Sequence, residues 1–156
     1  MANGICVYAE SYNGELETVA AELVSAAKGL AETTKEKVQA IVLSDHAEEL
    51  VKELDKLGVD EIYAVKADHD ITLQDAVSAA IAEMLKKIEP SAVLVPATPQ
   101  GRSIFSRVAM RLGCGMTADC TEVLAAQRED GSFYIKQNKP SYGENVFVTI
   151  LTKEGI

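Results

Sequence analysis

The sequence predicts one α/β domain over residues 1–156, a three-layer sandwich around a mainly parallel β-sheet with an antiparallel C-terminal extension. Three observations predict this fold. Four short apolar segments rich in Val and Ile lack polar alternation, which is typical of strands buried on both faces. Segments with helical periodicity separate them, which indicates parallel strands joined by right-handed crossovers. The length and the 47% of hydrophobic residues suit a single core, and no linker divides the chain.

The four parallel strands are expected at residues 4–9, 37–43, 60–65 and 92–96. After the first strand, apolar residues recur every three or four positions and give a helix one apolar face: Leu16, Val19, Ala20, Leu23, Val24 and Ala27. The second helix is expected to open with Asp45 and to stop at Gly58, because glycine tolerates a left-handed helix end.

The third and fourth helices carry similar signals. Thr72 is followed three residues later by Asp75, which is a capping pattern, and an apolar stripe then runs to Ile88. The fourth helix is expected to begin near Arg102 and to end at Gly113.

Beyond residue 115 the pattern changes. Residues 116–124 are expected to form one more strand. Residues 132–137 and 145–152 are also strand-like, and the turn-forming stretch NKPSYGE joins them. The C-terminal third is therefore predicted to be the antiparallel or crossing extension of the sheet.

The charge of the chain restricts its partners. The formal net charge is −9 and the pI is about 4.7, and the basic residues are scattered among acidic ones. These values disfavour binding to nucleic acid or to an anionic membrane surface. Proteins and small molecules are the expected partners.

The expected location is cytoplasmic, without membrane insertion. No apolar run approaches the ~18 residues that cross a bilayer, and the start of the chain lacks signal-peptide features. Cys6, Cys114 and Cys120 have no C-x-x-C spacing, which favours reduced, packed thiols over a disulfide framework. His46 and His69 offer too few ligands to predict a zinc site.

The candidate binding site is the corner between the fourth strand and the fourth helix, Ala97–Arg102. Ligands of open parallel sheets bind beyond the carboxyl ends of the strands, where the strand order reverses. If the fourth strand lies beside the first, this corner meets the loop Ala9–Gly14. Gly101, Arg102 and Ser103 would then offer N–H groups of a helix start and a forked cation to a phosphate or carboxylate.

A purely structural interpretation of that corner is open as well, and the residue types alone favour it. Pro96 and Pro99 would stiffen the corner, Gly101 would let the helix start, and Arg102 would be a solvated charge. Helix starts that bind nothing are common, and the P-loop and dinucleotide fingerprints are absent from the sequence.

The remaining polar clusters predict no active site. Residues 68–70 (Asp, His, Asp) and 44–46 (Ser, Asp, His) are expected to be solvated loops and caps at helix starts. The Gly-x-Gly at residues 113–115 is expected to be a helix cap and turn. Nothing in the sequence indicates that a nucleophile and its base converge.

Two groups at the C-terminal side allow either a functional or a structural interpretation. Arg107 and Arg111 lie one helical turn apart and could clamp an anion or a partner carboxylate, or lie on an exposed helix face. Lys139, Tyr142 and Asn145 surround a turn that is expected to be a hairpin connection.

Two ordered stretches, Pro90–Val123 and Lys139–Ile150, resemble the amino-terminal domain of the alpha subunit of electron-transfer flavoprotein. The first contains an apolar strand, an Ala-Thr corner, Gly-Arg, a helix with paired arginines, a Leu-Gly end and Thr-Ala-Asp-Cys-Thr. The second contains Pro, Tyr-Gly and Asn, and the stretches ICVYAE and ADHDITLQDAV extend the likeness. The departures are Ser103, Lys139 and Glu144, where the family usually has an acidic residue, Arg and Gly.

The resemblance implies a fold related to adenine-nucleotide alpha-hydrolase and universal stress protein domains. It also implies a heterodimer with a similarly folded beta subunit, beneath a mobile domain that holds FAD. In the family that FAD-binding domain is the carboxyl-terminal half of the alpha chain, which this sequence lacks, so no flavin-binding residue is assigned here. The complete protein would pass electrons from flavin dehydrogenases to an acceptor, and this domain would be a non-catalytic scaffold that binds no cofactor itself.

Two other functions remain open. One is a stand-alone adenine-nucleotide-binding module of the universal stress type, although no Gly-rich phosphate loop follows the fourth strand. The other is a small hydrolase with its active site at the corner Ala97–Arg102, which would need a nucleophile and a base that converge there.

Overall fold

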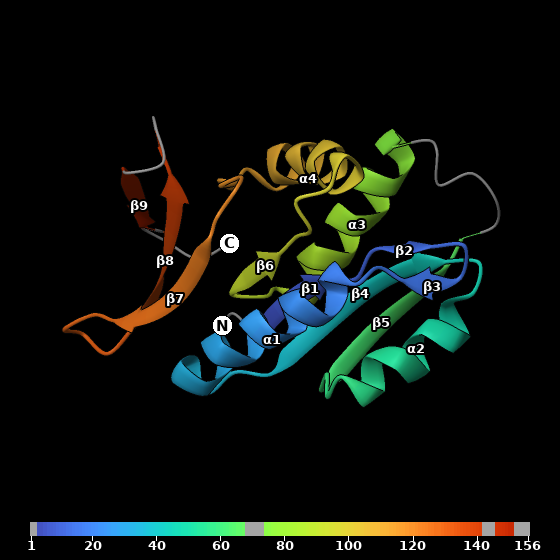
Figure 1. Ribbon diagram of the computed structural model, residues 1–156, viewed down its shortest axis with the longest axis horizontal. Coiled ribbons are helices and arrows are strands. Elements are labelled where there is room, and N and C mark those ends of the chain that lie inside the picture. The colour runs from blue at the N-terminus through green and yellow to red at the C-terminus, as the bar shows by residue number, and fades with distance from the viewer. Residues whose placement is uncertain (1–2, 68–73, 142–145, 152–156) are drawn as a thin grey trace.

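The computed structural model describes residues 3–67, 74–141 and 146–151 (Figure 1). Strands and helices alternate through the first two thirds of the chain, and three strands follow. The elements are β1 (Ile5–Tyr8), β2 (Ser11–Tyr12), β3 (Glu15–Leu16), α1 (Val19–Thr34), β4 (Val38–Ser44), α2 (Ala47–Lys56), β5 (Glu61–Lys66), α3 (Gln74–Ile88), β6 (Ala92–Leu94), α4 (Pro99–Leu112), β7 (Glu122–Gln127), β8 (Phe133–Pro140) and β9 (Phe147–Leu151).

The main sheet has four parallel strands in the order β5-β4-β1-β6. Ile5 of β1 pairs with Val38 of β4 on one side and with Ala92 of β6 on the other. The fourth parallel strand thus lies beside the first, which is the condition that the sequence analysis set for the candidate binding site. All residues of β1 and β4 are buried, as expected for strands covered on both faces.

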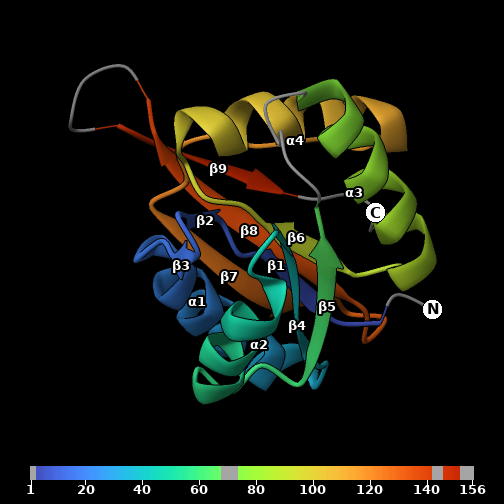
Figure 2. The same cartoon turned by 90° about the vertical axis from the view of Figure 1, so that its right-hand side faces the viewer.

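Helices cover both faces of this sheet, so the predicted three-layer sandwich is confirmed (Figure 2). Ile5 and Val7 point into the core with α1 and α2, and Cys6 and Tyr8 point into the core with α3 and α4. The alternation follows from the two-residue period of a strand. In the second core, the Tyr8 ring packs against Phe105 of α4, with the ring centroids 4.9 Å apart.

The loop after β1 contains a hairpin that the sequence analysis did not predict. Strands β2 and β3 pair as antiparallel partners around Asn13 and Gly14, whose φ angles are 51° and 80°. Asn-Gly is the dipeptide that best tolerates two successive positive φ angles in a tight turn. Leu16 therefore belongs to β3, and the first helix begins at Val19 rather than at Leu16.

Two helix starts differ from the prediction. Helix α4 begins at Pro99, one turn before the predicted Arg102, because Thr98 caps it and proline suits a first helical position. Helix α2 begins at Ala47, with His46 rather than Asp45 at the N-cap position. The predicted start of α3 at Thr72 lies outside the described residues.

The last three strands form a separate antiparallel sheet in the order β7-β8-β9. The predicted antiparallel extension is thus confirmed, but its first strand starts at Glu122 and not at residue 116. The irregular stretch before Glu122 includes Asp119, whose φ of 60° does not fit a strand. Within the part of the chain that is described, no helix has the length and apolarity needed to cross a membrane.

Candidate functional site

The loops after β1 and β6 meet at the carboxyl end of the main sheet, as predicted for the point where the strand order reverses. The Thr98 hydroxyl donates a hydrogen bond of 2.7 Å to Oε2 of Glu10 and accepts one of 2.9 Å from the Gly101 N–H. Glu10 is buried, with 7% of its surface exposed. The crevice therefore holds a carboxylate of the protein itself, beside the capped start of α4.

The three residues of the predicted anion site already have partners inside the protein. Besides the Gly101 contact, the Arg102 guanidinium forms a salt bridge of 2.5 Å to Asp119 and donates to the Ala97 carbonyl at 3.1 Å. Ser103 Oγ donates to Gln74 Oε1 at 2.6 Å. Both side chains of the Arg102–Asp119 pair are about half exposed. Anion binding at this corner stays a prediction.

The paired arginines of α4 hold the start of α3. Arg107 donates to Gln74 Oε1 at 3.0 Å and to the Ser103 hydroxyl at 2.8 Å. Arg111 forms a salt bridge of 2.7 Å to Asp75. The two guanidinium groups thus fasten the two helices that cover one face of the sheet, and binding of an anion or of a partner carboxylate by these arginines stays a prediction.

The cluster at residues 44–46 has the geometry of a turn. The Ser44 hydroxyl accepts a hydrogen bond of 3.1 Å from the backbone N–H of His46. The His46 ring instead lies 3.7 Å from the Asp45 carboxylate. This arrangement is a side-chain turn at a helix start. The clusters at residues 68–70, and Tyr142 and Asn145 of the predicted hairpin connection, lie outside the described residues.

The three cysteines are wholly or partly buried. Cys6 is buried in β1, and burial raises the pKa of its thiol to about 12. Burial also raises the pKa of Cys114 and of Cys120. Protonated thiols are poor nucleophiles and poor metal ligands. Within residues 3–67, 74–141 and 146–151, no group of three or more His, Cys, Asp or Glu residues could hold a metal ion.

An apolar cavity of about 590 Å³ separates the two sheets. Its walls come from β6, from α4 and from the facing strands β7 and β8, and they include Val93, Leu94, Val95, Phe105, Leu112, Val123 and Ile135. Strand β6 is the end strand of the main sheet in this part of the structure. The C-terminal sheet therefore does not continue the main one, and it leans on α1 instead (Figure 1).

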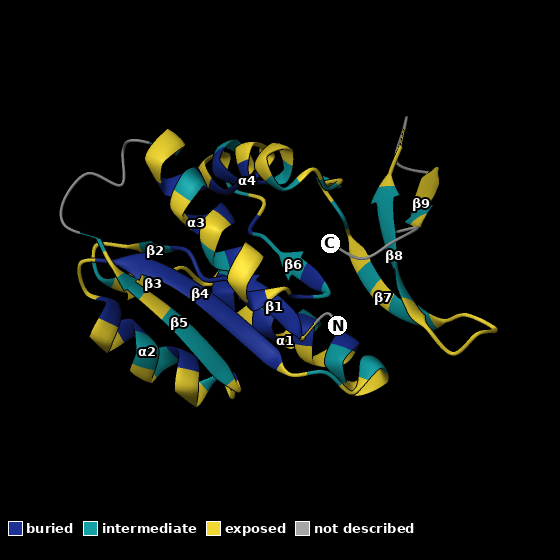
Figure 3. Cartoon of the chain, turned by 180° about the vertical axis from the view of Figure 1, so that it is seen from behind, coloured by how far each residue is buried: buried dark blue, intermediate teal, exposed yellow. Residues whose placement is uncertain are grey.

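The C-terminal sheet exposes apolar side chains on the face that turns away from the domain. Val123, Ala125 and Ile135 pack one face against the core. On the opposite face, Leu124 and Leu151 lie in one cross-strand row, on either side of Lys136. Phe147 shares this face because it lies four residues before Leu151 on the same strand. Leu124, Phe147 and Leu151 are 44%, 63% and 54% exposed, and together we call them the apolar sheet surface. Strand β9 is largely exposed, in contrast to the buried β4 of the main sheet (Figure 3).

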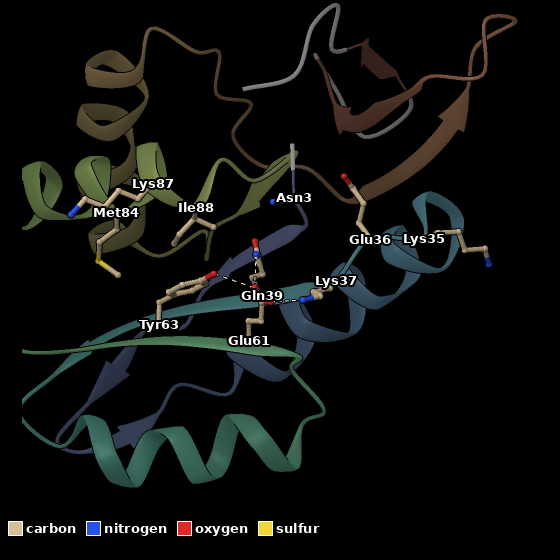
Figure 4. Close-up of a pocket in the computed structure, with 10 residues that line it drawn as sticks. All are labelled: Asn3, Lys35, Glu36, Lys37, Gln39, Glu61, Tyr63, Met84, Lys87 and Ile88. Carbon is tan, nitrogen blue, oxygen red and sulfur yellow. Dashed lines mark hydrogen bonds and ion pairs between the residues drawn. The ribbon is translucent and has the colours of Figure 1, made fainter. Parts of the chain in front are cut away.

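A polar cluster lies at the opposite, amino end of the main sheet. Glu61 at the start of β5 accepts hydrogen bonds from Lys37 at 2.5 Å, from Gln39 at 2.9 Å and from Tyr63 at 3.1 Å (Figure 4). These donors, with the Lys37 bond contributing most, lower the pKa of Glu61 from its ordinary 4.5 to about 2. The sequence analysis missed this cluster, although Gln39 is a polar residue inside an otherwise apolar strand.

Replacing Glu61 with Gln should remove part of the acid sensitivity of the fold. A carboxyl whose pKa is lower in the folded state stabilises it above about pH 4.5, and this contribution is lost as the pH falls towards about 2. Urea unfolding at several pH values measures the effect. We expect the difference in stability between the native protein and Glu61→Gln to shrink as the pH falls through this range. If the difference in stability stays constant from pH 6 to pH 2, the pKa of Glu61 is not lowered in the folded state and the prediction is wrong.

Comparisons with known proteins give a consistent family assignment. Residues 5–156 match the family described as "Electron transfer flavoprotein domain". The electron transfer flavoprotein subunit alpha of Thermoanaerobacterium thermosaccharolyticum is 34% identical over 149 residues, which are 94% of this chain and 43% of that protein. Lactate dehydrogenase (NAD(+),ferredoxin) subunit LctC of Acetobacterium woodii is 32% identical over 151 residues, which are 96% of this chain and 35% of that protein.

A third relative is named for a different role. The acryloyl-CoA reductase electron transfer subunit beta of Anaerotignum propionicum is 33% identical over 122 residues, which are 76% of this chain and 33% of that protein. The chain thus spans less than half the length of each of these relatives. Two of the three are named as subunits of enzyme complexes.

Proposed function

The chain belongs to the electron transfer flavoprotein family, and on that premise we propose that it is the amino-terminal scaffold domain of an alpha-type subunit. In this proposal the domain docks a beta-type subunit. FAD is held by residues outside this chain, and the complete protein passes electrons from flavin dehydrogenases to an acceptor in the cytoplasm. The domain itself catalyses nothing and binds no flavin.

The observation that carries the proposal is the apolar sheet surface. An antiparallel sheet that covers a core on one face normally presents polar side chains on the other. Here Leu124, Phe147 and Leu151 are exposed on the outer face, where they alternate with the polar side chains of Lys136, Asn138 and Thr149. Exposed apolar side chains that gather in one place mark a surface for another protein. The alpha-type relatives make a beta-type subunit the occupant that we propose.

The contacts in the crevice at the carboxyl end of the sheet favour the role of a scaffold over that of a nucleotide-binding module of the universal stress type. A bound phosphate there would face the buried Glu10 carboxylate, which repels it. The N–H of Gly101 and the guanidinium of Arg102, which the phosphate would need, are bonded to Thr98 and Asp119.

The test is the affinity for the beta-type subunit of the same organism, measured by isothermal titration calorimetry. We expect Leu124→Glu and Phe147→Glu each to weaken binding by about tenfold or more, because each places a charge in an apolar contact. Met110→Glu is the matched control, since Met110 is 84% exposed on α4, away from the apolar sheet surface. Circular dichroism would check that each variant is folded.

Two results would contradict the proposal. One is the failure of the unaltered chain to bind the beta-type subunit at all. The other is an equal loss of binding in Met110→Glu and Phe147→Glu, because the contact would then not be specific to the C-terminal sheet.

A further inference from the structure

The apolar cavity between the two sheets borders the edge of a strand. Strand β6 is the end strand of the main sheet in the described part of the chain, where its pairing partner is β1. The cavity runs along all of β6, since residues 91–95 line it. Strands β7 and β8 of the C-terminal sheet line it as well, and they pair with each other and not with β6 (Figure 1). The described strands of the two sheets therefore face each other here without a shared hydrogen-bond ladder.

The pairing of β1 decides which backbone groups of β6 point to this edge. The Ile5 N–H donates to the Lys37 carbonyl just before β4, so the next residue, Cys6, turns its N–H and carbonyl towards β6. Cys6 is the partner of Val93, and in a parallel pair a residue bonds to the two neighbours of its partner. These neighbours are Ala92 and Leu94. The N–H and the carbonyl of Val93 therefore point away from β1, towards the cavity.

The edge of β6 lacks the charged side chains that protect an end strand. The other end strand, β5, begins with Glu61 and ends with Lys66. Residues 92–95 are Ala, Val, Leu and Val, and charged side chains on an end strand are what hinders its pairing with a further strand. A backbone N–H or carbonyl among apolar side chains is costly, because it has few water molecules to bond to. A further strand beside β6 would remove that cost.

An extended polypeptide matches both the edge and the walls of the cavity. Val93 presents a donor and an acceptor side by side, and a residue of a neighbouring strand can bond to both. Peptides add to the free edge of a sheet in this way. The walls include Leu112 of α4 and, on the C-terminal sheet, Val123 and Ile135. These walls fit a segment with apolar side chains.

The charges at the cavity restrict the segment further. Its charged lining residues are Glu22, Arg102, Asp119 and Glu122. Arg102 is paired with Asp119, so the lining includes no cation that balances the other two carboxylates. A basic residue in the segment would complement them.

The end of β9 lies beside the wall of this cavity. Gln137 of β8 lines the cavity and pairs with Ile150 of β9, and neighbouring strands lie about 4.8 Å apart. A chain that continues from β9 therefore starts within reach of the cavity. Two of the relatives are more than twice as long as the stretch that they share with this chain, which is 35% of one and 43% of the other. A tethered segment also has a higher effective concentration than a separate molecule.

We propose that a segment of the complete subunit, from the polypeptide that continues after residue 156, adds to β6 as a further strand of the main sheet. The segment is extended and mainly apolar, and it carries a basic residue near Glu22 and Glu122. This inference rests on the proposed function, because only a longer subunit contains such a segment. The apolar sheet surface stays available to the beta-type subunit, because it lies on the face of the C-terminal sheet opposite to Val123 and Ile135.

The experiment measures amide hydrogen exchange at Val93 by NMR, in the full-length alpha-type subunit and in residues 1–156 alone. We expect the Val93 N–H to exchange at least about tenfold more slowly in the full-length subunit, because the added strand accepts its hydrogen bond. Leu94 is the internal control. Its N–H is bonded to β1, so its exchange should be slow in both chains.

Synthetic peptides copied from the coding sequence after residue 156 locate the segment. When they are added to residues 1–156, one of them should slow the exchange of the Val93 N–H. Two forms of that peptide, N-methylated on alternate amides, each lose the hydrogen bonds of one edge only, so one form should protect Val93 and the other should not. Glu22→Lys should weaken binding of the peptide severalfold. Glu32→Lys changes an exposed glutamate of α1 away from the cavity lining and should leave binding unchanged.

Three results would overturn the inference. The first is equally fast exchange of the Val93 N–H in the two chains, and the second is equal protection by the two N-methylated forms. The third is protection of Val93 by the beta-type subunit and not by the longer chain, because the strand would then come from the partner. The third result leaves the proposed function intact. Conversely, a beta-type subunit that fails to bind contradicts the proposed function but does not alter the exchange at Val93, which is measured without that subunit.

Discussion

Gly101→Ala is expected to lower the free energy of unfolding by about 3 kcal/mol, because it overpacks the joint between β6 and α4. A Cβ atom at this position would overlap the carbonyl oxygen of Pro96, and a backbone atom cannot move aside as a flexible side chain can. Either the first turn of α4 shifts away from the sheet or Pro96 does. Both movements disturb the hydrogen bonds of Thr98, so glycine is required here by the close approach of two backbone segments.

The measurement is urea unfolding followed by circular dichroism. Gly29→Ala is the matched control, since Gly29 lies inside α1 with open space around the position of a Cβ atom. That change should stabilise the protein by about 0.5–1 kcal/mol, because alanine favours a helix more than glycine does. If Gly101→Ala and the native protein unfold at the same urea concentration, a Cβ atom fits at this position and the prediction is wrong.

Thr98→Val is expected to cost about 2–4 kcal/mol, the second large effect. The substitution keeps the shape of the side chain but removes its hydroxyl, which donates to Glu10 and accepts from Gly101. Loss of the cap costs about 1 kcal/mol, and a buried carboxylate that loses a hydrogen bond adds a further penalty of about 1–3 kcal/mol.

Thr98→Ser is the control for this prediction. Serine keeps a hydroxyl that can make both hydrogen bonds and is also a good helix cap, so the variant should retain most of the stability of the native protein. The prediction fails if Thr98→Val and Thr98→Ser unfold at the same urea concentration. In that case the bond between Glu10 and Thr98 would contribute nothing to the fold.

The parallel sheet could be predicted from the sequence because the patterns that indicate its strands and helices are local. Buried strands such as Val38–Ser44 are continuous apolar runs, and the connections between them have helical periodicity. The strand order was only supposed from the sequence, as a condition for two loops to meet, and the structure has that order. The family resemblance, which depended on short ordered motifs, is confirmed by the family match over residues 5–156.

Helix starts were less predictable because apolar periodicity marks only the positions that face the core. In α4 the first such position after the strand is Gly101, but the helix begins at Pro99 under the Thr98 cap. In the same way, the apolar residues near Met116 suggested a strand, although the backbone at Asp119 cannot continue one. Caps and single positive φ angles decide these boundaries, and neither affects the periodicity.

The side-chain clusters could not be predicted from spacing along the chain. Glu10 and Thr98 are 88 residues apart, and Gln39 and Glu61 are 22 residues apart. Each pair meets only because neighbouring strands are in register, as in the pairing of Gln39 with Glu61 across β4 and β5. A polar residue in an apolar strand was the available signal for Gln39, and a polar residue directly after a buried strand was the signal for Glu10.

The position of β1 inside the main sheet has a consequence for the order in which the protein forms during its synthesis. Strand β1 leaves the ribosome before both of its partners: it pairs with β4, which follows 33 residues later (Ile5 with Val38), and with β6, which follows 87 residues later (Ile5 with Ala92). The half made of β1, β4 and β5 can assemble first, because its pairings are closer along the chain. One edge of β1 then stays unpaired until β6 emerges. A nascent chain arrested before Ala92 therefore exposes the hydrogen-bonding edge of an apolar strand, which is a surface that chaperones and aggregating chains both bind.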